Sequence, residues 1–334
     1  MLRETIKLNM NEVPYPPPQE ITAAAQKGLL KLNRYTGPEE LERLRQLLAD
    51  YAGVSKRHVI VGPGSDLLLR EMIYAFSKGR KVVTLSPSFF PTIQAARQFA
   101  TRWLSIRLSP PTFDLNLDLL TDVVKEPCLV IIDNPNNPTG QMLLDRQTVE
   151  STVENTEVFL VIDEAYYEFS GETFADMVEV HPNLAITRTM DKAFSLAGAR
   201  VGYAIVGEAF QDALSSFYAL LPQPSLYAAI EALNNPMYVR KNAQRINQER
   251  ERLRSALDEV DKRHAMGVHV YPSNTNFLLV KTEIPDVARR LKDVDVLVSD
   301  LSNQLPAEFI RVSIGTAEEN DAFLHAYMRI CQED

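Results

Sequence analysis

Three polar segments of this chain each follow a short apolar run, and the runs are predicted to be buried strands. The apolar runs are 129–132, 158–162 and 184–187. The side chains that come after them are Asn137, Asp163, Tyr166, Thr189 and Lys192. Ligands of open α/β sheets bind at the carboxyl ends of the strands. These side chains are therefore expected to meet in one site.

The combined residue types suggest one cofactor. A lysine among small and apolar residues can form a Schiff base with an aldehyde. The carboxylate of Asp163 can keep a pyridine nitrogen protonated, and Tyr166 and Asn137 can donate to a ring oxygen. Thr189 and Arg200, with the amides of a helix start, can hold a phosphate. Each segment alone is equally explained as a turn or an exposed loop, but together they predict pyridoxal phosphate.

The elements that must position these groups belong to the α/β class. Short apolar runs alternate with helical patterns, which is typical of a mostly parallel sheet covered on both faces. The predicted strands of the first part are 59–61, 81–85, 103–108, 129–132, 158–162, 184–187 and 201–206. A helix at 38–52 precedes these strands, and the helices between them include 65–76 and 91–100. We expect a large domain with a seven-stranded sheet.

The pattern changes after about residue 230. A long polar helix at 240–260 is followed by short strands at 268–271, 277–280, 296–298 and 309–312, and by a helix from Ala317. This predicts a smaller α+β domain. The proline-rich start, 1–18, is expected to be extended. The predicted division is an extended N-terminal arm (1–30) that joins the small domain and active site, a large cofactor domain (31–235) and a small domain (236–334).

Composition narrows the function classes. The formal net charge of −9 argues against a nucleic-acid partner. No apolar run approaches the roughly 18 residues of a membrane span, and the first residues lack the apolar core of a signal peptide. Two distant cysteines fit a reducing compartment, and the five histidines show no metal-ligand spacing. We expect a cytoplasmic protein without a metal.

The chain also resembles the fold-type-I pyridoxal-phosphate aminotransferases, in particular those that act on histidinol phosphate. The resemblance covers nearly the whole sequence and rests on LNMNEVPYP, RYTGPEEL, VGPGSD, NPNNPTG, DEAYYEF, RTMDKAFSLAGARVGY and IRVSIGTAEEN. It implies transamination between histidinol phosphate and 2-oxoglutarate, giving imidazole-acetol phosphate and glutamate, in histidine biosynthesis.

The resemblance also implies roles for individual residues. The catalytic residues would be Lys192, as Schiff-base lysine and proton carrier, together with Asp163 and Tyr166. Asp163 would pair with the pyridine nitrogen, while Asn137 and Tyr166 would face the ring oxygen. Thr189 and Arg200 would bind the phosphate.

Further cofactor contacts follow from the same motifs. The backbone of Ser65 and Asp66 would bind the phosphate, and Phe89, where a tyrosine is usual, would stack on the ring. Tyr35 would reach the phosphate of a neighbouring subunit, which implies a homodimer. Arg311 would bind the anionic group of the substrate, and Tyr15 and Asn11 would close over it.

Two positions depart from the family pattern. Ser299 stands where a second anion-binding arginine is usual, which removes an expected phosphate anchor. Asp191 replaces the usual serine before Lys192. A carboxylate there would raise the pKa of the lysine and weaken the phosphate region, so we expect Asp191 to point away.

These departures leave other functions open. Ser299 is compatible with an aminotransferase for aromatic or other amino acids. A lyase such as threonine-phosphate decarboxylase shares most of the cofactor motifs, although the ending IGTAEEN argues against it. A non-catalytic regulator would need a DNA-binding domain for which the chain has no room.

Overall fold

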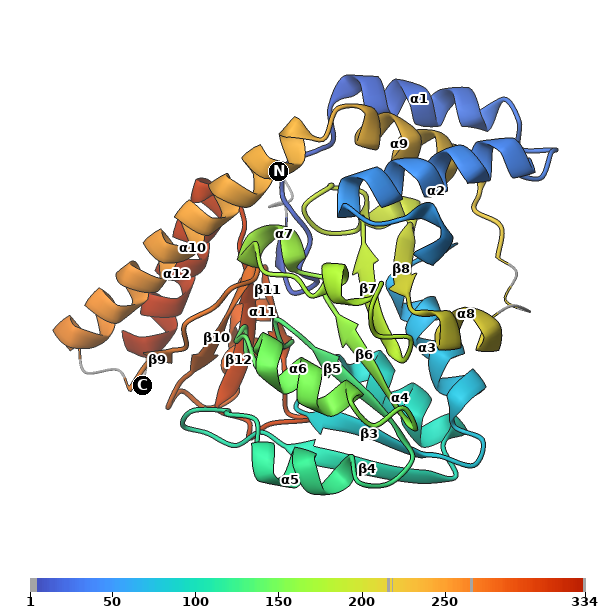
Figure 1. Ribbon diagram of the computed structural model, residues 1–334. Coiled ribbons are helices and arrows are strands. Elements are labelled where there is room, and N and C mark those ends of the chain that lie inside the picture. Colours follow the sequence, from blue (N-terminus) through green and yellow to red (C-terminus); the bar gives the residue numbers. More distant parts are fainter. Residues whose placement is uncertain (1–4, 215–216, 218, 265–266, 333–334) are drawn as a thin grey trace.

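The computed structural model describes residues 5–214, 217, 219–264 and 267–332. Two sheets form the framework, one large and one small, with helices around both (Figure 1). None of the helices in these ranges is long and apolar enough to cross a membrane.

The large sheet has seven strands in the order β2-β8-β7-β6-β5-β3-β4. The strands are β2 (Val59–Gly62), β3 (Lys81–Ser86), β4 (Arg102–Arg107), β5 (Cys128–Asp133), β6 (Val158–Asp163), β7 (Leu184–Thr189) and β8 (Gly202–Val206). β8 runs antiparallel to both of its neighbours, and the other pairings are parallel. The predicted mostly parallel sheet is confirmed, because each predicted strand overlaps an observed one.

Helices cover both faces of this sheet, as the unbroken apolar strands predicted (Figure 1). In β5, Leu129 and Ile131 pack into one core cluster, and Val130 and Ile132 into the other. The elements around the sheet are α2 (Pro38–Ala52), η1 (Lys56–His58), α3 (Ser65–Phe76), α4 (Phe90–Phe99), α5 (Leu117–Val123), α6 (Arg146–Val153), α7 (Tyr167–Ser170), η2 (Ala175–Met177), η3 (Ala197–Ala199) and α8 (Glu208–Ala213).

The small sheet has the order β1-β11-β12-β10-β9. Its strands are β1 (Ile6–Leu8), β9 (His269–Val270), β10 (Phe277–Lys281), β11 (Val296–Asp300) and β12 (Phe309–Ser313). The helices of this part are α10 (Met237–His264), α11 (Val287–Lys292) and α12 (Ala317–Gln332). We propose that the domains divide where α9 (Gln223–Asn234) ends and α10 begins.

The N-terminal segment differs from the prediction in two ways. Part of the predicted extended arm is helical, because α1 (Gln19–Leu29) packs on α9 (Figure 1). Gly28 lets the two helices approach closely, since a Cβ there would overlap the backbone of Pro224. The strand β1 was not predicted, and it pairs in parallel with β11. Residues 1–4 of the predicted arm lie outside the described residues.

Candidate active site

A cavity of about 290 Å³ opens at the carboxyl ends of β5, β6 and β7. All but two of the predicted site residues line it. They are Asn11, Ser65, Asp66, Phe89, Asn137, Asp163, Tyr166, Thr189, Lys192, Arg200 and Arg311. Asp133 and Asp191 lie in the same lining. The expectation that consecutive strand ends bring these groups together therefore agrees with the structure.

Lys192 lies in the loop after β7 and is half-buried. Its Nζ is 3.5 Å from the carbonyl oxygen of Met10. Burial lowers the pKa of this amine to about 8, although the nearby carboxylate of Asp191 opposes the shift. About a tenth of Lys192 is therefore neutral at pH 7, far more than for an ordinary lysine, and a nucleophile or a proton acceptor must be neutral.

Asp163 is the last residue of β6 and is buried. Its Oδ1 accepts a hydrogen bond from Thr187 Oγ1 at 2.7 Å. Desolvation raises the pKa of Asp163 to about 7, while the bond from Thr187 acts in the opposite direction. A cationic ring nitrogen beside this carboxyl would favour its ionised form.

The Tyr166 hydroxyl is a second polar centre of the cavity. It accepts hydrogen bonds from Asn11 Nδ2 at 2.8 Å and from Asn137 Nδ2 at 3.3 Å. Burial raises the pKa of Tyr166 to about 12, so the phenol keeps its proton at neutral pH. Its O–H remains able to donate to an oxygen in the cavity.

One corner of the cavity combines groups that suit an anion. Ser65 and Asp66 begin α3, where the first backbone N–H groups have no helical acceptor. A Cβ on Gly202 would overlap the backbone nitrogen of Ser65, so β8 and the start of α3 approach closely only because this residue is glycine. Thr189 and Arg200 line the same cavity.

The expected orientation of Asp191 is wrong. Its carboxylate lines the cavity and is bonded to the Arg200 guanidinium rather than pointing away. Arg200 also contacts Asp66 Oδ1 at 2.5 Å through Nη2. The guanidinium attracts Asp191 into the site because a nearly buried carboxylate needs a cationic partner.

Arg311 lies on β12 at the side of the cavity formed by the small sheet. Its Nη1 donates to Asn137 Oδ1 at 2.6 Å and its Nη2 to the Asn9 carbonyl at 2.8 Å. Its buried Nε has no hydrogen-bond partner among the described residues. Ser299 is the register partner of Arg311 on β11. Arg311 therefore has one unpaired donor, its Nε. Its neighbour on β11 is Ser299 and not the second anion-binding arginine that the family pattern predicts.

Sequence reasoning did not single out Asp133. This buried carboxylate accepts bonds from Ser88 Oγ at 2.7 Å and Asn137 N at 2.7 Å, and further bonds from Phe89 N and Asn136 Nδ2. It thus fixes the turn that carries Asn137 and the backbone of Phe89. The sequence feature that could have identified Asp133 is its position at the end of a strand, directly before the polar run 134–140.

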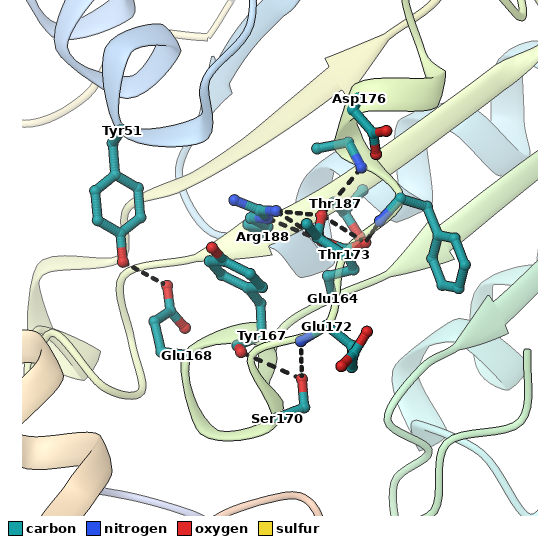
Figure 2. Close-up of polar contacts among 12 residues, drawn as sticks. Tyr51, Glu164, Tyr167, Glu168, Ser170, Glu172, Thr173, Asp176, Thr187 and Arg188 are labelled. Atoms are coloured by element: carbon teal, nitrogen blue, oxygen red, sulfur yellow. Dashed lines mark hydrogen bonds and ion pairs between the residues drawn. The ribbon is translucent and has the colours of Figure 1, made fainter. Parts of the chain in front are cut away.

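A buried ion pair that sequence reasoning also missed joins the ends of β6 and β7 (Figure 2). Arg188 Nη2 lies 2.9 Å from Glu164 Oε2, and the guanidinium is 3.7 Å from the centre of the Tyr167 ring. Glu164 follows Asp163, and Arg188 precedes Thr189. Because side chains alternate along a strand, the pair can brace the two strand ends from the side opposite the cavity.

Two predicted site residues do not line the cavity. Tyr15 is half-buried, and its ring lies 5.3 Å from the guanidinium of Arg245 on α10. Tyr35, on the connection between α1 and α2, is 88% exposed. Tyr15 thus lies outside the lining of the cavity, and Tyr35 is exposed enough to reach another molecule.

The cavity fits the expected pyridoxal phosphate in its donor set. Lys192 can react with the aldehyde, Asp163 can face the ring nitrogen and Tyr166 can face the ring oxygen. The unpartnered Arg311 Nε remains for a substrate anion. The one group that conflicts with a phosphate is the carboxylate of Asp191.

Comparison with known proteins agrees with this arrangement. The family model for aminotransferase class I and II matches residues 3–326. The chain is 37% identical over 332 residues to the histidinol-phosphate aminotransferase of Sulfurisphaera tokodaii, covering 97% of this chain and 89% of that protein.

Solved structures show the same fold. The histidinol-phosphate aminotransferase of Clostridium acetobutylicum superimposes with a TM-score of 0.88 at 21% identity, covering 98% of this chain and 99% of that one. The enzyme of the same name from Sinorhizobium meliloti, in complex with pyridoxal-5'-phosphate, gives 0.86 at 24% identity and covers 99% and 92%. This chain therefore belongs to the class I and II aminotransferase family.

Proposed function

We propose that the protein is a pyridoxal-phosphate-dependent aminotransferase that converts histidinol phosphate and 2-oxoglutarate to imidazole-acetol phosphate and glutamate. The observation that carries the proposal is the single cavity that places Lys192 with Asp163, between the Arg200 corner and Arg311. Nearly full-length similarity to histidinol-phosphate aminotransferases supports the substrate.

The proposed roles follow from the contacts. Bound pyridoxal phosphate supplies an aldehyde that takes up the amino group and a protonated ring that accepts the electron pair of the broken C–H bond. Lys192 Nζ, with a pKa lowered to about 8, removes the proton from the substrate carbon and returns it during the transfer. The Asp163 carboxylate holds the ring proton, and the Tyr166 hydroxyl donates to the ring oxygen.

Binding of the substrate is assigned to the opposite side of the cavity. Arg311 Nε can donate to the anionic group of each substrate in turn, phosphate or carboxylate. Asn11 lies between the two halves of the site, since it bonds both Tyr166 and Ser313.

Half-reactions of the purified holoenzyme test the proposal. Histidinol phosphate should change the visible absorbance of the bound cofactor, and 2-oxoglutarate should restore it. Lys192→Ala should abolish both the visible absorption band that the cofactor shows when joined to Lys192 and the transamination. If histidinol phosphate leaves the spectrum unchanged while other amino acids alter it, the proposed substrate is wrong.

Ser299 favours a second candidate, an aminotransferase for aromatic or other amino acids. It places a short neutral side chain opposite Arg311, where an arginine would have supplied a second charge for a phosphate. The ratio of kcat/KM for histidinol phosphate and phenylalanine separates the two candidates. Release of CO2 without 2-oxoglutarate would instead identify a lyase acting on an amino-acid phosphate.

We also propose that the active form is a homodimer. The end of α1 and the connection to α2 expose Leu29, Leu30, Leu32 and Tyr35, with exposed fractions of 51%, 86%, 70% and 88%. Several large apolar side chains exposed within one short segment are typical of a protein interface. Light scattering coupled to size exclusion should give twice the chain mass, and a monomer would refute the proposal.

A cytoplasmic location completes the proposed function. It is supported by the small number of cysteines, which provides no disulfide framework. Fractionation of cells with an antibody to the protein tests it.

A further inference from the structure

The carboxyl group of Asp191 has one satisfied oxygen and one unsatisfied oxygen. The residue is 8% exposed, and its Oδ2 is bonded to Arg200 Nη1. Its buried Oδ1 has no hydrogen-bond partner among the described residues. A buried polar atom without a partner is costly, so an unpaired oxygen in a cavity wall indicates that something else binds there.

The surroundings of Asp191 indicate what binds. Its backbone N–H donates to Thr189 Oγ1 at 3.0 Å, and Arg200 also holds Asp66 at the start of α3. A guanidinium, a hydroxyl and a helix N-terminus together suit a phosphate monoester. The two carboxylates, however, occupy the two guanidinium nitrogens that such a phosphate would use.

The charges of the cavity favour the uptake of a proton when a phosphate binds. Its lining holds four carboxyl groups, Asp66, Asp133, Asp163 and Asp191. Three cations oppose them, Lys192, Arg200 and Arg311. A phosphate dianion next to an ionised Asp191 would add like charge to a poorly solvated site.

Asp191 is the carboxyl group placed to take up this proton. The charged groups that act on it are Arg200, Lys192 and Asp66. Desolvation raises the pKa of Asp191, the two cations lower it, and Asp66 raises it again, with a net upward shift. An approaching phosphate would raise the pKa further.

We propose that Asp191 is protonated when the phosphate of the cofactor is bound, and that its carboxyl O–H donates a hydrogen bond to a phosphate oxygen. This inference rests on the proposed function, because pyridoxal phosphate is taken as the ligand. The protein then takes up a proton at Asp191 on binding, and the affinity for the cofactor falls as pH rises.

Asp191→Asn isolates this effect, because the amide donates a hydrogen bond at every pH and cannot ionise. The probe is pyridoxamine 5'-phosphate, which has no aldehyde to react with Lys192. Its dissociation constant is measured for both apoenzymes between pH 6 and 9. Both proteins also carry Lys192→Ala, because Asp191 raises the pKa of the Lys192 amine, and titrations of the probe and of the remaining groups then largely cancel in the ratio. The wild-type to Asp191→Asn ratio should rise about tenfold or more over this range, one pKa unit being a factor of ten.

Asp66→Asn is the matched control, since Asp66 contacts the same guanidinium but its side chain is 43% exposed. This variant removes a carboxylate from the same guanidinium but leaves the Asp191 carboxyl group in place, so it should keep the wild-type pH dependence. Calorimetry in buffers of different ionisation enthalpy should show that the wild type takes up more protons on binding than Asp191→Asn.

The role of Asp191 would be overturned if the ratio of the wild-type and Asp191→Asn dissociation constants did not change with pH. Equal proton uptake by these two proteins would also overturn it, and so would an equal loss of pH dependence in Asp66→Asn. Failure of both pyridoxal phosphate and the probe to bind either protein at any pH would instead overturn the proposed function. If Asp191→Asn does not fold, Asp191→Ser takes its place, because its hydroxyl also donates a hydrogen bond at every pH and cannot ionise.

Discussion

Asp133 and Asp163 are neighbouring carboxyl groups in one cavity, because they are register partners at the ends of β5 and β6. Burial raises the pKa of Asp133 to about 6, although four hydrogen bonds to it act in the opposite direction. Each group therefore resists ionisation in the apoenzyme. Ionisation of either carboxyl group therefore lowers the free energy of unfolding of the native state.

This predicts a pH-dependent difference between wild type and Asp133→Asn. The native state retains the Asp133 proton up to about pH 6, whereas an unfolded aspartate loses it near pH 4, so native Asp133 binds more protons in between. The wild-type free energy of unfolding, relative to Asp133→Asn, should fall by about 3 kcal/mol from pH 4 to pH 7.

Urea unfolding of the two apoenzymes at several pH values measures this difference. Asp114→Asn is the control, because it removes one carboxyl group from the exposed surface instead of from the buried cavity. A difference between wild type and Asp133→Asn that grows with rising pH would contradict the predicted sign.

At the scale of single residues, the sequence predicts which side chains form the site but not the direction in which each of them points. Lys192, Asp163 and Asn137 could be predicted because each follows a strand end, where topology determines the position. The orientation of Asp191 could not, since it depends on Arg200, nine residues later in the chain, which turns back into the site in a left-handed conformation with φ of 52°. Asp133 was missed because a strand's last residue is equally well explained as an ordinary polar end.

At the scale of elements, the approach of β8 to α3 determines the anion-binding corner. Gly202 pairs with Gly62 on one side and Thr189 on the other. Gly202→Ala would force apart β8 and the start of α3, because its Cβ overlaps backbone atoms that cannot rotate away. Such overpacking costs about 1–3 kcal/mol and should raise the dissociation constant of pyridoxal phosphate about ten- to a hundredfold.

Gly198→Ala is the matched control for this substitution. Gly198 lies in η3, shortly before Arg200, and a Cβ added there would meet no neighbouring atom within 4 Å. Titration of both apoenzymes with the cofactor tests the prediction. Equal affinities in the two variants would show that the contact between β8 and α3 does not determine cofactor binding.

The ion pair between β6 and β7 gives a prediction for stability. Glu164 and Arg188 have side chains that are 0% and 2% exposed, so removing one partner leaves an uncompensated buried charge (Figure 2). Glu164→Gln or Arg188→Met should each lower the free energy of unfolding by about 3–5 kcal/mol. The double variant should lose less than the sum of the two.

An exposed pair provides the comparison. Arg146 contacts Asp176 at 2.6 Å, with side chains that are 54% and 62% exposed. Arg146→Ala should change the free energy of unfolding by no more than about 1 kcal/mol. Denaturant unfolding of all four variants measures both pairs, and strictly additive losses at Glu164 and Arg188 would contradict coupling between them.

Some elements of the fold could be predicted from the sequence and others could not, for physical reasons. Strands such as 158–163 are continuous apolar runs buried on both faces, so local sequence is sufficient. β1 has only three residues, and its partner Val296 lies at the other end of the chain. No local periodicity reveals a pairing of that kind. The helix α1 was hidden by the prolines before it, although its buried face, Ile21, Ala24 and Gly28, has helical spacing.

At the scale of the whole molecule, the N-terminal segment joins the two sheets at the cavity. β1 extends the small sheet, and Asn11 then bonds Tyr166 of the large domain and Ser313 of β12. The carbonyl of Met10 contacts Lys192. The active site therefore depends on contacts between segments that are far apart in the chain, and only the folded molecule completes it.

The exposed Tyr35 extends this dependence to a second copy of the chain. It does not line the cavity of its own subunit, so its proposed contact with a cofactor phosphate must be made in the partner. In a symmetric dimer each site would then combine Lys192 of one chain with Tyr35 of the other. Tyr35→Ala and Lys192→Ala should therefore complement each other.

Co-expression with two different tags yields the heterodimer of these variants. One of its sites carries both lesions, and the other has an intact Lys192 and an intact Tyr35. Transamination per dimer should therefore be about half that of wild type, although each parent homodimer is defective. If Tyr35 acted within its own subunit, both sites of the heterodimer would carry one lesion. Its activity would then be no higher than the mean of the two homodimers, and the shared site would be excluded.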